Sequence, residues 1–147
     1  MTRGGAANIY EQQYQMHRFV SEHYRKPFAV HDLGWVSMGL RRGPYVLDLW
    51  GLASNEAVRQ RDKSPEWLDE ITRRHGTGLA MIYRPAFRAV PASWTKVAEL
   101  HLASRRVTAS EATVQIYATA VGDKADIARH LTAFKPKLPE GVKLVIE

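Results

Sequence analysis

The chain has 147 residues, of which 45% are hydrophobic and 24% are charged, so it is long and apolar enough for one folded domain with its own core. Its 21 Lys and Arg residues exceed its 15 Asp and Glu residues, which gives a net charge of +6. The absence of cysteine excludes disulfides, zinc–thiolate sites and thiol catalysis, and no window holds the roughly 20 apolar residues that cross a bilayer.

The first part of the chain is predicted to be a helix that follows a short lead. Residues 1–7 contain two adjacent glycines and other small residues, so we interpret them as a flexible lead or an artificial extension, and residues 8–147 as a single domain. From Asn8 to Tyr24 the apolar residues recur at helical spacing, and a proline follows soon after. A second, more polar stripe on the same helix contains Tyr10, Tyr14 and His17.

The middle of the chain alternates between apolar runs and capped helices. Strands are predicted at 28–30, 35–40, 45–50 and 79–83. Helices are predicted to begin after Ser54 and after Ser64, since serine is a favoured N-cap and a proline follows the second one. The segment 94–102 is ambiguous between a helix capped by Ser93 and a strand, because Val97 and Leu100 do not fit a period of two.

The last third of the chain completes an alternating pattern. A strand is predicted at Thr113–Thr119, a helix from Asp123 to Phe134, and a final strand at Val142–Ile146. The order of elements predicts an α/β fold with a single mixed β-sheet and helices packed on it, as a three-layer-like arrangement or a two-layer sandwich. The strand at 113 and its predecessor are candidates for an antiparallel pair.

Two aspartates follow apolar strands, and a glycine comes soon after each of them. Asp32 stands beside His31 and is followed by Gly34, whereas Asp48 is followed by Gly51. Ligands bind at the carboxyl ends of strands in open α/β sheets, so both carboxylates are candidates for ligand contact. An aspartate beside a tight turn also accepts backbone N–H bonds and fixes the turn. Both interpretations are open at this point.

The candidate binding residues are the two aspartates, the neighbouring histidine and an arginine pair in the turn between the two segments: His31, Asp32, Arg41, Arg42 and Asp48. No phosphate-binding glycine motif, paired-histidine metal motif or nucleophile elbow occurs, so we predict no catalytic residue, metal or cofactor. The basic residues are scattered and form no contiguous stripe, so we do not expect a nucleic-acid partner. The four tryptophans would stack on sugar rings if exposed, although a core position is the more common role.

The two aspartate segments together resemble a known protein family. They read Ala29-Val30-His31-Asp32-Leu33-Gly34 and Val46-Leu47-Asp48-Leu49-Trp50-Gly51-Leu52-Ala53-Ser54. The pattern resembles the C-terminal region, outside the membrane, of bacterial polytopic membrane proteins of the dolichyl-phosphate-mannose-dependent mannosyltransferase class, the family 39-like or C-type glycosyltransferases. The residues that match the pattern are Asp32, Gly34, Asp48, Gly51 and Leu52, with Ser54 as the cap of the next helix.

The resemblance implies a function for the parent protein rather than for this chain alone. Members of the class transfer a sugar from a polyprenyl-phosphate donor to an acceptor outside the cytoplasm, and their catalytic carboxylates lie in a region that this chain does not contain. We therefore expect a non-catalytic accessory domain on the periplasmic side of a bacterial membrane, which caps the membrane active site or binds the acceptor. The implied partners are the membrane part of the parent chain and an anionic lipid, a polyprenyl-phosphate lipid or a glycan. The positive charge would favour anionic headgroups.

The sequence also allows an alternative function for this chain. The chain would then be a stand-alone α/β enzyme or a small-ligand-binding domain that uses a strand-end pocket at Asp32 and Asp48. This alternative requires one pocket that contains both carboxylates.

Overall fold

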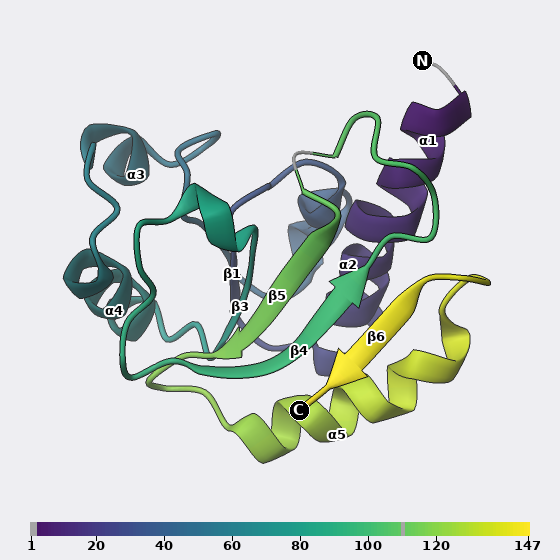
Figure 1. The fold of residues 1–147 in the computed structure, drawn as a ribbon. Coiled ribbons are helices and arrows are strands. Elements are labelled where there is room, and N and C mark those ends of the chain that lie inside the picture. Colours follow the sequence, from purple (N-terminus) through teal and green to yellow (C-terminus); the bar gives the residue numbers. More distant parts are fainter. Residues whose placement is uncertain (1–2, 110) are drawn as a thin grey trace.

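Six strands form one mixed sheet in the order β2–β1–β3–β5–β4–β6, as shown in the computed structural model (Figure 1). The structure describes residues 3–109 and 111–147, and it describes the backbone but not the side chain of Arg41. The strands are β1 (Phe28–Val30), β2 (Val46–Asp48), β3 (Leu79–Ile82), β4 (Thr95–His101), β5 (Thr113–Ala118) and β6 (Lys143–Ile146). The predicted α/β fold with a single mixed sheet is confirmed.

The sheet has a parallel half and an antiparallel half. β1 pairs in parallel with β2 on one side and with β3 on the other, and Val30 stands between Asp48 and Met81. The carboxyl ends of these three strands therefore meet at one edge of the sheet. β5 runs antiparallel to both β3 and β4, and β6 is antiparallel to β4. The expected antiparallel pairing of the strand at 113 with its predecessor is confirmed.

A single long helix opens the described chain. It comprises α1 (Arg3–Ile9) and α2 (Gln15–Arg18), which are joined and extended by the π-helical segments Tyr10–Tyr14 and Phe19–Tyr24. The prediction of a flexible lead over residues 1–7 is wrong for residues 3–7, and residues 1–2 lie outside the described part.

Two glycines let the first turn of this helix pack closely against the loop between β4 and β5. A Cβ on Gly4 would lie 3.0 Å from a methyl group of Val107, so the missing side chain lets the helix approach the loop between β4 and β5 closely. The backbone carbonyl of buried Gly5 accepts a hydrogen bond from the Thr108 hydroxyl at 3.1 Å.

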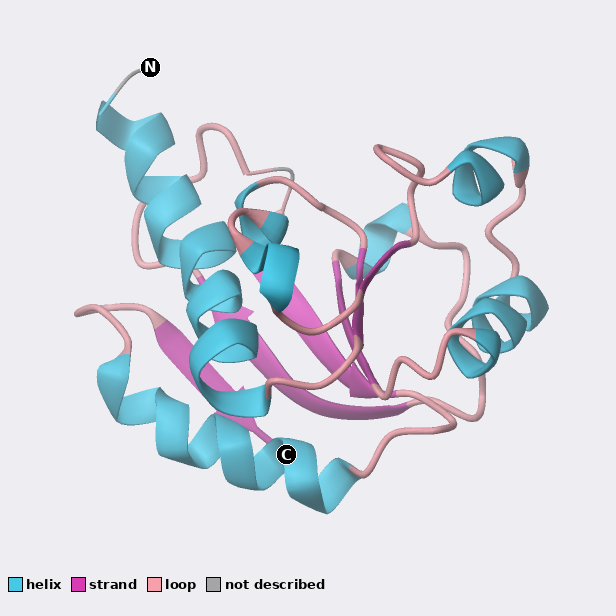
Figure 2. Ribbon diagram, turned by 180° about the vertical axis from the view of Figure 1, so that it is seen from behind, coloured by secondary structure: helices cyan, strands magenta, loops and turns pink. Residues whose placement is uncertain are grey.

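Helices cover both faces of the sheet, but not equally. The first helix and α5 (Lys124–Phe134) lie on one face of the sheet, which is turned toward the viewer in Figure 2. On the other face, α3 (Asn55–Arg59) and α4 (Pro65–Arg74) pack over the parallel half. The first face buries the larger core, to which the two helices contribute Met16, Phe19, Val20, Tyr24, Ile127, Leu131 and Phe134. The parallel half is therefore a three-layer structure. No helix in the described ranges is long and apolar enough to span a membrane.

One local prediction is wrong, and one open alternative is decided. The expected strand at 35–40 is instead a pair of 3₁₀ turns, Trp35–Ser37 and Leu40–Arg42, because Gly39 turns the chain with a φ of 73°. The segment 94–102, which the sequence left open between a helix and a strand, is the strand β4. Ser93 caps no helix there, and its hydroxyl donates to Asp69 at 2.6 Å. The other caps are confirmed, since Ser54, Ser64 and Asp123 each accept the N–H of the residue three positions on.

Candidate ligand-binding groove and the strand ends

Asp48, at the end of β2, is a buried carboxylate that builds the turn which follows it. Its Oδ1 accepts the backbone N–H groups of Trp50 and Gly51 at 3.0 Å, and its Oδ2 accepts those of Ala53 at 2.6 Å and Ser54 at 3.0 Å. Burial opposes ionisation, but the four donors outweigh it and hold the pKa of Asp48 below its usual value. Asp48 is thus committed to its own turn.

Gly51 completes this turn for steric and conformational reasons. Its φ of 108° is unfavourable for residues with a side chain, and a Cβ there would lie 2.9 Å from the backbone nitrogen of Val58 in α3. The turn after β2 therefore requires glycine at position 51.

Asp32, after β1, is held by side chains from distant parts of the chain. Its Oδ2 accepts a hydrogen bond from Gln13 Nε2 at 2.6 Å and a longer one from the Tyr83 hydroxyl at 3.4 Å. The single proton of this hydroxyl is shared with Gln12 Oε1, which is the nearer acceptor at 2.5 Å. Burial is the main reason why the pKa of Tyr83 is raised far above its usual value, with the Asp32 charge adding to it. Asp32 thus connects the end of β1 to the first helix.

His31 is packed among aromatic rings beside this carboxylate. Its ring meets those of Trp50, Tyr83 and Phe87 edge-on, with centroid distances of 4.8, 5.0 and 5.5 Å. Its Nδ1 is buried and has no hydrogen-bond partner among the described residues. Burial lowers the pKa of His31, and the charges of Asp32 and Asp48 only partly offset this effect. The environment therefore favours the neutral ring.

The remaining sequence-predicted residues do not assemble into one site with these groups. Asp48 borders a cavity of about 280 Å³, and the described lining of that cavity includes Tyr45 and His75 but not Asp32. Arg42 is exposed, and the side chain of Arg41 lies outside the described part. Within the described ranges, no three His, Asp or Glu side chains come together as a metal site. Asp32 borders a different cavity, together with His31 and Tyr83. Among the described residues, the two carboxylates thus line different cavities, and the enzyme alternative stays a prediction.

Gln13 connects the turn after β1 to the exposed residue Trp35. While its amide nitrogen donates to Asp32, its Oε1 accepts the backbone N–H of Trp35 at 3.1 Å. A Cβ on Gly34 would lie 2.6 Å from this Oε1 and 3.2 Å from Asp32 Oδ1. The missing side chain of Gly34 thus leaves room for the Gln13 amide, and the His31–Gly34 motif positions the tryptophan that follows it.

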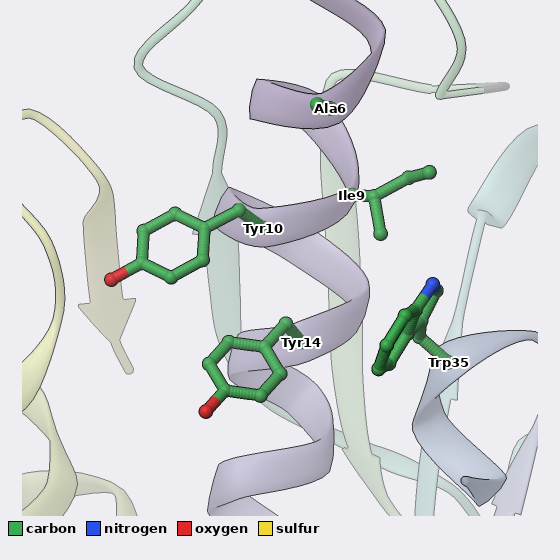
Figure 3. Close-up of a pocket in the computed structure, with 5 residues that line it drawn as sticks. All are labelled: Ala6, Ile9, Tyr10, Tyr14 and Trp35. Carbon is green, nitrogen blue, oxygen red and sulfur yellow. The ribbon is translucent and has the colours of Figure 1, made fainter. Parts of the chain in front are cut away.

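Trp35 forms one wall of an aromatic groove along the first helix (Figure 3). The groove has a volume of about 430 Å³, and it is lined by Ala6, Ile9, Tyr10, Tyr14 and Trp35. The exposed fractions of Tyr10, Tyr14 and Trp35 are 49%, 37% and 43%, and the two tyrosine rings stack at a centroid distance of 5.6 Å. In the view of Figure 3, Ile9 extends from the helix toward Trp35, and the two tyrosine rings are seen on the left of the helix.

The helix geometry beneath the groove is unusual. Tyr10 and Tyr14 mark the two ends of a π-helical segment, a feature that is frequent at functional sites. Sequence reasoning placed both tyrosines on a polar stripe but did not identify a site there. Their i, i+4 spacing was the available signal, and the contribution of Trp35 depends on the tertiary fold.

A comparison with known proteins places the chain in a family. The sequence profile of a domain of unknown function (DUF8728) matches residues 7–117, which is more than half of the chain. The chain belongs to this family. The segment that matches DUF8728 contains both aspartate turns and nearly all of the groove. No curated protein and no solved structure matches the chain significantly.

Proposed function

We propose that this DUF8728 domain is a non-catalytic binding domain whose ligand is a neutral glycan seated in the aromatic groove. The observation that carries the proposal is the exposure of three aromatic rings, those of Tyr10, Tyr14 and Trp35, around one groove. Its volume of about 430 Å³ is within the range of roughly 300–1,000 Å³ that small-ligand sites occupy.

The chemistry of the lining favours a sugar over a charged ligand. A pyranose ring has an apolar C–H face that packs flat on an aromatic ring, while its hydroxyls stay in contact with water. The tyrosine hydroxyls add a polar tip to an apolar platform. None of the described residues that line the groove is charged, so it offers no counter-ion for a phosphate or carboxylate group.

The proposal agrees with one part of the wider expectation from the sequence, the binding of a glycan acceptor. A membrane glycosyltransferase-like parent, a periplasmic location, and contacts with an anionic or polyprenyl-phosphate lipid stay predictions, and the groove does not depend on any of them.

The test is a calorimetric titration of the protein with neutral hexose oligosaccharides. We expect Trp35→Ala to weaken binding about tenfold, since an aromatic contact and its buried area are together worth about 1.4 kcal/mol. Trp50→Ala is the matched control, because Trp50 is 44% exposed, close to the 43% of Trp35, but lies against His31 after β2. The control should bind as the unchanged protein does.

Two results would count against the proposal. The first is the absence of binding to every neutral oligosaccharide at millimolar concentration. The second is binding of anionic phospholipid vesicles that depends on Trp35 without any binding of sugar, which would assign the groove to a membrane surface instead.

A further inference from the structure

β6 is an edge strand, and its outer side presents backbone groups that have no partner strand among the described residues. In the pairing of β6 with β4, Val145 stands opposite Glu99 and Lys143 opposite His101, while the N–H of Glu147 donates to the Val97 carbonyl at 2.8 Å. Hydrogen-bonded and non-hydrogen-bonded pairs alternate in an antiparallel ladder. Residues 143, 145 and 147 therefore bond to β4, and the backbone groups of Leu144 and Ile146 point away from the sheet.

The sequence of β6 is suited to antiparallel pairing with a second copy of the same strand. It reads Lys143-Leu144-Val145-Ile146-Glu147. In an antiparallel pair of two copies centred on Val145, each Lys143 lies opposite the Glu147 of the other copy. Leu144 and Ile146 then form the hydrogen-bonded pairs, so the outward backbone groups of both copies are satisfied.

We propose that two copies of this chain associate through their β6 strands, with a two-fold axis at Val145 that joins the two sheets into one. A two-fold interface must be self-complementary, and this register meets that condition in charge as well as in hydrogen bonding. Opposite charges directly across a strand pair stabilise it, and like charges in the same place destabilise it.

The side chains on the open face fit this arrangement. Val145 is 50% exposed, and in a non-hydrogen-bonded pair the two valines come close enough to pack. Glu147 already pairs with Lys96 at 2.7 Å, and Lys96 also pairs with Glu99 at 2.9 Å. The Lys143 of a second copy would add a cation to a network that holds two carboxylates and one lysine. The opposite edge of the sheet, β2, is only three residues long and shows no such symmetry.

The experiment is sedimentation of the chain over a range of concentrations. We expect the mass to rise from that of one chain toward that of two. Lys143→Glu places two glutamates opposite each other and should weaken association by roughly tenfold, since the symmetric interface contains the pair twice. Glu147→Lys should have a similar effect, and the double exchange Lys143→Glu with Glu147→Lys should restore association.

The following results support or overturn the proposed association through β6. All three variants change exposed side chains, and a cooperative unfolding transition in each establishes that it folds. Equal stability is not required, because Glu147→Lys also removes the ion pair with Lys96. A chain that remains monomeric at every concentration overturns the proposal. Association that is insensitive to both single exchanges also overturns it, because the interface would then lie elsewhere. A double exchange that associates no better than Lys143→Glu alone overturns it as well when Lys96→Glu is added, since that change gives residue 147 an ion-pair partner again.

Discussion

The turns after β1 and β2 look alike in sequence, but the structure uses their aspartates in different ways. Asp48 accepts four backbone N–H groups from the six residues that follow it, so its bonds are local. Asp32 binds the side chains of Gln13 and Tyr83, which are 19 and 51 positions away. One carboxylate fixes its own loop, whereas the other connects a strand end to a helix and, through Gln13, to Trp35.

This difference gives the two carboxylates different roles: Asp48 stabilises the fold, and Asp32 helps to position Trp35. A buried acceptor that satisfies several backbone donors cannot be removed without leaving those donors unpaired. A partly exposed acceptor that binds flexible side chains can be replaced by water. The comparison therefore assigns a structural role to the β2 turn and places the candidate site on the side of the β1 turn.

The largest expected effect comes from Asp48→Ala. We predict that it lowers the free energy of unfolding by about 3–4 kcal/mol, because four donors lose a charged acceptor. Asp32→Ala should cost about 1 kcal/mol, since its partners are side chains that can rearrange. Urea denaturation of both variants measures the difference. Equal losses for the two variants would remove the distinction between the turns.

Gly34→Ala tests the link between the β1 turn and the groove. The added methyl group would displace the Gln13 amide, so we expect a loss of about 1–2 kcal/mol in stability together with weaker sugar binding. In a double-mutant cycle, Gly34→Ala in a Gln13→Ala background should cost much less, because the clashing atom is gone. Additive losses would show that the clash with Gln13 is not the reason for the glycine.

The smallest effect is a pH dependence that distinguishes the two turns. His31 has a pKa below its ordinary value of 6.5, so the unfolded chain takes up a proton before the folded one as the pH falls. Its contribution to stability is complete above pH 6.5 and is lost below it. Asp48, with a pKa below 3.8, keeps its contribution until the pH falls beneath that value. Burial also lowers the pKa of His23, so part of the slope between pH 7 and 5 belongs to that residue. His31→Phe should reduce the slope of the unfolding free energy in this range, and an unchanged slope would contradict the assignment.

Much of the fold could be predicted from local sequence signals. The caps at Ser54, Ser64 and Asp123 and the period of two over 113–119 are properties of short segments, and the structure confirms them. The ambiguity at 94–102 has a physical cause. A bulge between Lys96 and Ala98 adds a residue to β4, which breaks the period of two and lets both Val97 and Leu100 enter the core.

The candidate site was less accessible to sequence reasoning. The two aspartates have the same local pattern, and only the tertiary fold shows that one meets backbone groups and the other meets Gln13 and Tyr83. The groove depends on a turn that brings Trp35 beside the first helix, which periodicity over 35–40 did not predict. Long-range contacts of this kind leave little trace in short patterns.

The most direct measurement of the central claim is a nitrogen–proton NMR titration with a neutral hexose oligosaccharide. The four tryptophans give four indole N–H signals, which single substitutions assign. The account predicts that the Trp35 signal shifts with the backbone signals around Tyr10 and Tyr14, while the Trp50 signal stays in place. A shift confined to Trp50 and His31, or no shift at all at saturating sugar, would contradict the assignment of the groove as the binding site.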